Sequence, residues 1–483
     1  MQKNPLHELM NPKSIAFMGA SKNISRMGSF LMINTIAGKF EGPIYPVHPK
    51  EETVLGLKAY KRLKDLPEVP GLLVLVIPTQ LVPEILEEAG EMGIRYAVIV
   101  TAGYDEIGTS QGRALQEKID RIVEKYGIRY VGANCIGVYN SFAKLNPTPF
   151  PNRLPPGKVG MISHSGTYLS HLFPHLESLD FNFGEGISIG NGTSIDTVDA
   201  LEYFSERDEI EVIGMYLEGL KRADCFLNAA CRISKKKPLV ALYTGGTEGG
   251  ARSASTHTAA MSGSDAVFNA AFQQAGIIRA WSIEELLDYT WAFATQPLPQ
   301  GDKMAVITVS GGPGTSMADS IFRCGLKLPE FPSDMRKEID KHLPHTGCSI
   351  NPVDITFSMN QEAFFRHIPE IVLKSDLVDG VFIYGILGSD MMMELNELMG
   401  GTLFQGDISM IQEMNISAAK EFVKFVSGFG KPVLGSSFQA HLDSMVKTVR
   451  REGIPIYTAS ERAVKAMAAL YQYKKYRDSR VNT

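Results

Sequence analysis

The chain has 483 residues, of which 44% are hydrophobic and 21% are charged, and its formal net charge is −5 at pH 7. This length exceeds what one hydrophobic core organises, so two to four domains are expected. The acidic balance argues against a general nucleic-acid-binding protein, which needs concentrated Lys and Arg. The N-terminal stretch MQKNPLHELMNPKS lacks the apolar segment of a signal peptide, and no run of about 18 apolar residues predicts a membrane span.

Short apolar runs recur along the chain and predict parallel strands buried on both faces, because they are too continuous for strands with one solvent face. In chain order they are SIAFMGA (14–20), LLVLVIP (72–78), YAVIVTAG (96–103), KVGMISHSG (158–166), EVIGMYLEG (211–219), PLVALYTGG (238–246), KMAVITVSGG (303–312) and GVFIYGILG (380–388). Helical patterns lie between them, for example at 81–93 and 112–127. This alternation predicts an α/β protein with doubly wound sheets.

Two segments of the chain repeat each other. KVGMISHSG at 158 and KMAVITVSG at 303 align residue for residue, and each is followed by a Lys-Pro strand, KPLVAL at 237 and KPVLGS at 431. Proline clusters interrupt the pattern at 146–157 and 295–302. We therefore expect a Rossmann-like domain over 1–145, followed by two flavodoxin-like parallel-sheet domains over 146–298 and 299–483.

The first strand runs into a turn bracketed by Gly19 and Gly28, with a helix expected from about residue 28. Glycine at a strand-to-helix turn lets backbone N–H groups approach a phosphate, to which the helix N-terminus adds a favourable field. The second strand ends in His48-Pro49-Lys50, where a nicotinamide-binding fold would carry an acidic residue for the ribose. The basic end suits an additional phosphate and argues against an NAD-dependent dehydrogenase.

A single imidazole, His257, lies among small side chains in SASTHTAAMSG (253–263), after the glycine-rich approach YTGGTEGGAR. With an ordinary pKa near 6.5, an imidazole offers an unprotonated nitrogen that can accept a phosphoryl group at neutral pH. The small neighbours leave space around the ring, and from these residues alone a nucleophilic histidine and a histidine packed in the core are both open interpretations. The second repeat has no such approach, and its His441 is interpreted as structural.

The cysteines and the other histidines predict no metal site. Cys135, Cys225, Cys231, Cys324 and Cys348 form neither a C-x-x-C pair nor a zinc spacing, which is typical of reduced thiols in a cytoplasmic protein. His164 and His171 lack Cys or acidic partners at ligand spacing.

Motifs along nearly the whole chain resemble those of the ADP-forming acyl-CoA synthetases, the acetate–CoA ligase family related to succinyl-CoA synthetase. The resemblance is carried by GAS (19–21), HPK (48–50), VIP (76–78), TAGY (101–104), GANCIGVYN (132–140), SHSGT (163–167), SIGNG (188–192), YLEGL (216–220), STHTAAMSGSD (255–265), SGGPG (310–314) and NPVD (351–354). It implies that His257 becomes phosphorylated and that Glu218 hydrogen-bonds its ring.

The resemblance also implies two sets of ligand-binding residues. The CoA-binding set is Gly19, Ala20, Ser21, Lys50, Ile77, Pro78, Thr79, Thr101, Ala102 and Gly103. The phosphate-binding set, which supplies backbone donors, is Ser165, Gly166, Thr167, Gly190 and Asn191.

The implied activity is reversible conversion of acyl-CoA, phosphate and ADP to a carboxylic acid, CoA and ATP. No Walker-type motif occurs in the sequence. In the family that the motifs resemble, an ATP-grasp domain holds the nucleotide, so the resemblance implies that ATP, ADP and Mg bind through a separate ATP-grasp beta-type subunit, in a hetero- or homo-oligomer. The sequence departs from the family at Gly192, where Lys is usual, at Gly246, near a usual Arg, and at His164, where Gln is usual. The two lost cations leave open a non-catalytic CoA- or acyl-CoA-binding regulatory subunit.

Overall fold

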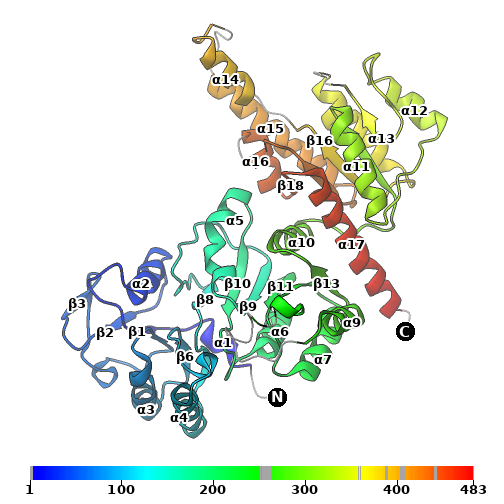
Figure 1. Ribbon diagram of the computed structural model, residues 1–483. Coiled ribbons are helices and arrows are strands. Elements are labelled where there is room, and N and C mark those ends of the chain that lie inside the picture. The colour runs from blue at the N-terminus through cyan, green and yellow to red at the C-terminus, as the bar shows by residue number, and fades with distance from the viewer. Residues whose placement is uncertain are drawn as a thin grey trace. The chain divides into compact units, whose positions relative to one another are not determined.

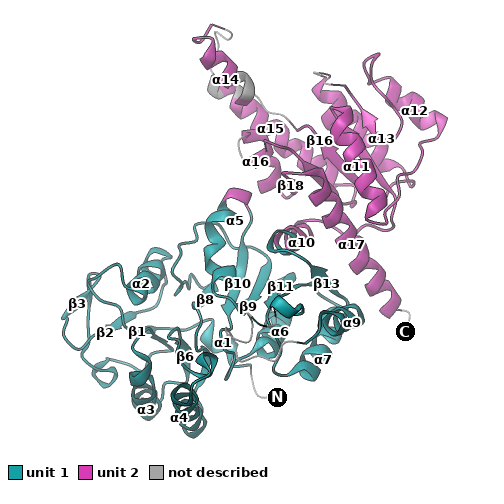
Figure 2. Ribbon diagram, viewed as in Figure 1, with its two compact units in different colours: residues 1–177, 181–286 teal, residues 178–180, 287–483 magenta. Residues whose placement is uncertain are grey.

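The computed structural model describes residues 4–250, 252, 263–356, 358, 360–386, 390–402, 408–439 and 443–481. The chain divides into two compact units, which are coloured separately in Figure 2. Unit 1 contains residues 1–177 and 181–286, and unit 2 contains residues 178–180 and 287–483. Among the described residues, no helix has both the length and the apolar character needed to cross a membrane.

The first sheet of unit 1 is parallel throughout, in the order β2-β1-β5-β6-β7. Its strands are β1 (Ile15–Met18), β2 (Ile44–Val47), β5 (Leu72–Leu75), β6 (Tyr96–Ile99) and β7 (Arg129–Gly132), and a hairpin is formed by β3 (Thr53–Val54) and β4 (Leu57–Lys58). Helix α2 (Met27–Ala37) lies on one side of this sheet, and α3 (Val82–Met92) and α4 (Ser110–Tyr126) lie on the other (Figure 1). Every residue of β5 is buried, as expected for a central strand covered on both faces.

The second sheet, also in unit 1, has the order β13-β12-β11-β9-β10-β8, in which only β8 is antiparallel to its neighbour. Its strands are β8 (Val138–Asn140), β9 (Val159–Ser163), β10 (Phe183–Ser188), β11 (Val212–Leu217), β12 (Leu239–Tyr243) and β13 (Ile277–Ala280). The helices of this part are α1 (Leu6–Leu9), η4 (Thr167–His171), α5 (Phe173–Leu179), α6 (Thr197–Glu206), α7 (Ala223–Ile233) and α9 (Asp265–Ala275). Asp196 and Asp199 form a capping box that fixes the first turn of α6.

The sheet of unit 2 is parallel, in the order β15-β14-β16-β17-β18. Its strands are β14 (Met304–Thr308), β15 (Val353–Asp354), β16 (Gly380–Tyr384), β17 (Val433–Ser436) and β18 (Ile456–Tyr457). The helices are α10 (Ile283–Thr295), α11 (Gly311–Arg323), α12 (Ser333–Asp340), η5 (Ala363–His367), α13 (Ile368–Lys374), α14 (Asp390–Leu398), α15 (Ile408–Ser427), α16 (Ser444–Arg451) and α17 (Ser460–Val481).

The three large sheets share one strand order when the strands of each are numbered along the chain. Each reads 2-1-3-4-5, with β8 added at the edge of the second sheet. This is the flavodoxin-like doubly wound order, in which ligands bind beyond the carboxyl ends of the strands where the order reverses. The predicted α/β class is confirmed. The predicted repeat is confirmed too, since β9 and β14 are both first strands and β12 and β17 are both fourth strands.

The first sheet has the same strand order as the other two, although the repeat found in the sequence relates only the second and third. Strand β8 already belongs to the second sheet, and the division between the compact units falls within α10, at 286/287. The domain limits 1–145, 146–298 and 299–483 remain a prediction.

Candidate functional site

The turn from β1 into α2 brings backbone segments unusually close together. Gly19 has a φ of +104°, and a Cβ built there would lie 1.9 Å from the carbonyl oxygen of Val76. A Cβ on Gly28 would lie 2.5 Å from the carbonyl oxygen of Gly19. Only glycine fits at either position, so the first helix turn approaches the ends of β1 and β5 at backbone distance. The buried Ala20 continues the turn, and Ser21 is held by Ser29, whose Oγ accepts from the Ser21 N–H at 3.1 Å.

A cavity of about 550 Å³ opens at this turn, within the range of small-molecule sites. It is lined by Gly19, Ser21, Asn23, Arg26, Met27, Gly28, His48, Glu51, Val76, Ile77 and Pro78. Four of the predicted CoA-binding residues therefore meet at one cavity. Lys50 is exposed and is not among the lining residues. Arg26, the N-cap residue of α2, is the only Lys or Arg among the described residues that line this cavity, and no motif in the sequence pointed to it.

The ends of β5 and β6 are tied together by two hydroxyl groups. Thr101 Oγ1 donates to the carbonyl oxygen of Ile77, and Thr79 Oγ1 donates to the carbonyl oxygen of Ala102, both at 2.7 Å. Gly103 follows with a φ of +113°. The predicted CoA-binding residues of these two strand ends therefore form one continuous edge, as parallel strands require.

Two predicted phosphate-binding residues lie against the first sheet. A Cβ on Gly190, which has a φ of +58°, would lie 2.2 Å from the carbonyl oxygen of Ala133. The Asn191 N–H donates to that same oxygen at 2.9 Å. The Asn191 side chain donates through Nδ2 to Glu106 Oε2 at 2.5 Å. Unit 1 thus brings the predicted CoA-binding and phosphate-binding loops together.

The other three predicted phosphate-binding residues follow β9. Ser163 Oγ donates to the carbonyl oxygen of Ser165 at 2.6 Å and shapes the turn. A Cβ on Gly166 would lie 2.6 Å from Ile136 Cβ, so the turn packs closely against the 132–140 segment. Thr167 is exposed and begins η4.

His164 joins the ends of β9 and β11 to the first turn of α6. Its Nδ1 accepts from the Glu218 N–H at 3.1 Å, so the neutral ring carries its proton on Nε2, which donates to Thr197 Oγ1 at 2.8 Å. Burial lowers the pKa of His164 from 6.5 to about 4; Lys221 adds to that shift and Asp196 opposes it. The ring is therefore uncharged at neutral pH.

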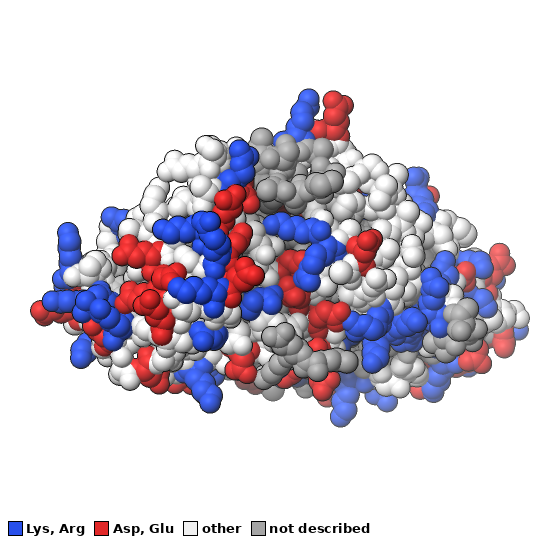
Figure 3. Space-filling model, turned by 90° about the horizontal axis from the view of Figure 1, so that it is seen from below, with Lys and Arg blue, Asp and Glu red and all other residues white. Residues whose placement is uncertain are grey.

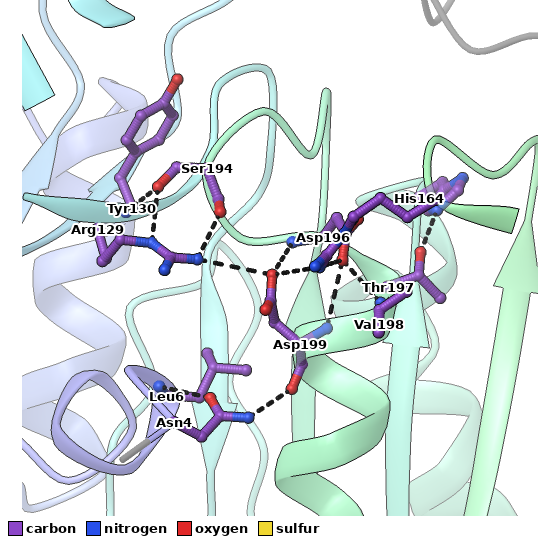
Figure 4. A network of polar contacts seen from close by, with 11 residues as sticks. Asn4, Leu6, Arg129, Tyr130, His164, Ser194, Asp196, Thr197, Val198 and Asp199 are labelled. Carbon is purple, nitrogen blue, oxygen red and sulfur yellow. Dashed lines mark hydrogen bonds and ion pairs between the residues drawn. The ribbon is translucent and has the colours of Figure 1, made fainter. Parts of the chain in front are cut away.

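Figure 4 shows how this region continues into the first sheet. Arg129 of β7 donates to the carbonyl oxygen of Ser194 at 2.7 Å and forms an ion pair with Asp199 at 3.6 Å. The backbone N–H of Val198 donates to Asp196 Oδ1 at 2.8 Å. These contacts fix the α6 N-terminus, and with it Thr197, relative to both sheets of unit 1.

Glu218 follows β11 at the carboxyl end of the strand. Its Oε2 is buried and has no hydrogen-bond partner among the described residues. Burial raises the pKa of neighbouring Tyr216 to about 12, and the carboxylate of Glu218 contributes to that shift. A buried carboxylate oxygen without a donor is costly, so a group that donates to it would stabilise the site.

His257 lies outside the described residues, as does His441. The described residues on either side of the His257 segment are held close together. The Asp265 N–H donates to the carbonyl oxygen of Gly246 at 3.3 Å, and Tyr243 Oη donates to the carbonyl oxygen of Gly263 at 2.8 Å. Both flanks therefore start from the end of β12. This strand lies next to β11, and Glu218 directly follows β11.

Cations near the predicted phosphate loop come from the segment after β11. Lys221 and Arg222 line a small cavity together with His164 and residues 190–192. Arg222 is committed to Asp196 and Asp199 by ion pairs. Among the described residues, no cluster of three or more His, Cys, Asp or Glu side chains could hold a metal ion.

Comparisons with known proteins match three regions in chain order. A CoA binding domain matches residues 13–141, a succinyl-CoA ligase like flavodoxin domain matches 156–293, and a ligase-CoA domain matches 304–376. The alpha subunit of acetate–CoA ligase [ADP-forming] II from Pyrococcus furiosus is 34% identical over 471 residues, covering 97% of this chain and 98% of that subunit. The chain belongs to the ADP-forming acetate–CoA ligase family. The resemblance inferred from the motifs is confirmed.

Other members of the family extend the comparison. The acetate–CoA ligase [ADP-forming] of Methanocaldococcus jannaschii is 36% identical over 464 residues, and the match covers 96% of this chain but 62% of that relative. The solved structure of the Ca. Korarchaeum cryptofilum dinucleotide forming acetyl-coenzyme A synthetase 1, in complex with phosphate and ADP, matches with a TM-score of 0.85 and 30% identity. That match covers 99% of both chains and confirms the fold.

Proposed function

We propose that this chain is the alpha-type subunit of an ADP-forming acid–CoA ligase, which interconverts acyl-CoA, phosphate and ADP with a carboxylic acid, CoA and ATP. The observation that carries the proposal is the buried Glu218 Oε2, which has no partner among the described residues, beside the strand from which both flanks of the His257 segment start. An imidazole N–H group would donate the hydrogen bond that this oxygen lacks. The carboxylate would fix the ring tautomer and favour the positive charge that develops as the ring takes a phosphoryl group.

The reaction has three balanced steps in this proposal. A phosphate oxygen attacks the thioester carbon of acyl-CoA, the carbon–sulfur bond breaks, and CoA leaves as the thiolate. A ring nitrogen of His257 then attacks phosphorus in the acyl phosphate, and the phosphorus–oxygen bond breaks to release the carboxylate. The phosphorus–nitrogen bond finally breaks as the phosphoryl group passes to the terminal oxygen of ADP. Ser165 to Thr167, with Gly190 and Asn191, would bind the phosphate in the first two steps.

CoA would bind at the cavity beside Gly19 and Ser21, whose volume and glycine turn suit a phosphorylated ligand. A beta-type subunit with an ATP-grasp domain would bind ADP, ATP and Mg. A partner subunit is supported by the name of a relative, because the Pyrococcus furiosus protein that matches 97% of this chain is the alpha subunit of an acetate–CoA ligase [ADP-forming]. Figure 3 shows Lys and Arg interspersed with Asp and Glu over much of the face drawn.

The deciding experiment is phosphoryl labelling of the chain with its beta-type subunit and labelled ATP, followed by alkaline mass spectrometry. We expect an acid-labile label on His257, which His257→Asn removes while CoA binding persists. Glu218→Gln should reduce the labelling rate without abolishing it, because orientation assists the nucleophile but does not replace it. The matched control is His171→Asn, which should label normally. In the wild-type chain the His171 ring packs on Phe150.

The alternative is a CoA-binding regulatory subunit without turnover. It is favoured by two departures from the family, because Gly192 stands where Lys is usual and Gly246 lies near a usual Arg. The same experiment separates the two functions. CoA binding without any label on His257, in the complete assembly with several short-chain acids, would establish the regulatory subunit. Label on His257 would exclude it.

A further inference from the structure

The βα loop after β6 carries a carboxylate that neither the motifs nor the proposed chemistry assigns. Glu106 is half-buried in η3 (Asp105–Ile107). Its Oε1 accepts from the Gly103 N–H at 2.5 Å and from the Tyr104 N–H at 3.2 Å. Its Oε2 accepts again from the Tyr104 N–H at 3.2 Å and from Asn191 Nδ2 at 2.5 Å.

These bonds connect two loops that are distant in the sequence. Glu106 and Asn191 are 85 residues apart and belong to the parts of unit 1 that contain different sheets. The contact is also anchored beyond Glu106. Asn191 is 8% exposed, its Oδ1 accepts from Asn134 Nδ2 at 3.3 Å, and its N–H donates to Ala133. Gly103 and Asn191 therefore share one carboxylate within an otherwise tightly packed junction.

We propose that Glu106 is a positioning residue that holds the 101–103 loop and the 190–191 loop at a fixed separation. The proposal rests on the proposed function, in which the first loop binds CoA and the second binds phosphate. Acyl transfer between those ligands depends on their relative placement, and a displacement of about 1 Å can cost on the order of a hundredfold in rate. A carboxylate suits this role because both of its oxygens only accept, and every partner here is an N–H donor.

Glu106→Gln tests the role with almost no change in shape. The Gln amide presents one acceptor and one donor, so its NH₂ group must face either the loop amides or Asn191 Nδ2, which are all donors. We expect faster hydrogen–deuterium exchange at residues 103–104 and 190–192 of the unliganded chain. We also expect CoA binding to weaken about tenfold, as for the loss of a hydrogen bond to a charged group. Glu117→Gln is the matched control, because it makes the same substitution at an exposed position of α4 where no side-chain hydrogen bond is described, and it should change neither quantity.

The decisive variant is the exchanged pair. In Glu106→Gln with Asn191→Asp, the Gln NH₂ group can donate to the new carboxylate while its oxygen accepts from the Gly103 and Tyr104 amides. We expect this double variant to restore the exchange rates, and the CoA dissociation constant to within about threefold, which a merely structural deletion would not do. Exchange is measured without ligand, so it decides the positioning role even if the chain binds no CoA. Wild-type chain that binds no CoA would refute the proposed CoA site. Unchanged exchange at 190–192 in Glu106→Gln, or no recovery in the double variant, would overturn the positioning role.

Discussion

Replacing His164 by Gln should leave the chain folded and active at pH 7 while changing how its stability depends on pH. The His164 ring uses one acceptor, toward the Glu218 N–H at 3.1 Å, and one donor, toward Thr197 Oγ1 at 2.8 Å. Gln offers the same pair of functions, so we expect a cost below about 1 kcal/mol. His164→Ala instead leaves the Glu218 N–H and the Thr197 hydroxyl without this partner, at about 1–3 kcal/mol for each group that stays unsatisfied.

The pH dependence follows from the lowered pKa of His164. The folded value is about 4 and the ordinary value is 6.5, so the unfolded chain binds more protons between these limits. The contribution of the neutral His164 ring to the free energy of unfolding is therefore fully present above pH 6.5, and it is lost as the pH falls toward 4. With these two values, protonation of the unfolded chain lowers the free energy of unfolding at pH 5 by about 2 kcal/mol relative to pH 7. Gln does not titrate and avoids this loss.

Urea unfolding at pH 7 and pH 5, followed by circular dichroism, measures the difference. Wild-type chain should lose about 2 kcal/mol more than His164→Gln over that interval, because the other titrating groups are common to both proteins. His164→Ala should lose no more than His164→Gln on acidification, although it starts less stable. Equal losses in wild type and His164→Gln would refute the assignment of a neutral, half-buried ring to His164.

Two further predictions concern the ligand loops. Gly190→Ala and Gly192→Ala both place Ala at a φ near +58°, which destabilises each variant by about 1 kcal/mol. The two variants differ in their steric contacts. The new Cβ at 190 meets a backbone carbonyl oxygen at 2.2 Å, whereas the new Cβ at 192 meets a side-chain methyl group at 2.9 Å. Urea unfolding should therefore show Gly190→Ala to be less stable than Gly192→Ala by a further 1–3 kcal/mol or so, and equal stabilities would contradict the close approach. Arg26→Glu should weaken CoA binding about tenfold in isothermal titration, and Lys50→Glu by less, because only Arg26 lines the cavity. A larger effect of Lys50→Glu would instead support the site predicted from the HPK motif.

The sequence allowed the elements to be predicted because buried parallel strands leave a local signal. Continuous apolar runs marked β5, β9, β11, β12 and β14, and each is buried along its length. Glycine at a strand-to-helix turn is also a local signal, and it pointed to Gly19, whereas Gly190 was indicated only by the resemblance of the SIGNG motif to the family. Both features depend on neighbouring residues alone, and the chain order of strands and helices then limits the possible sheets.

Contacts between loops left no such signal. Glu106 follows the quoted TAGY motif by two positions, yet its partner lies 85 residues away, and only the packing of the two sheets of unit 1 brings Asn191 to it. Arg26 was missed for a similar reason, because its place at the cavity depends on where α2 begins. His164 was recognised as a departure from the family, but its tautomer follows from two partners on other elements.

The replacement of the usual Lys by Gly192 weakens the case for turnover less than the sequence alone implied. Gly192 and Lys221 line the same cavity, with Lys221 entering from the segment after β11. Burial lowers the pKa of Lys221, and the carboxylates of Asp105 and Asp196 oppose that shift by favouring its charged form. Arg222 is already paired with Asp196, whereas no hydrogen bond or ion pair of Lys221 occurs among the described residues. A basic side chain therefore lies beside the predicted phosphate loop even though residue 192 carries none, which favours the catalytic subunit over the regulatory one.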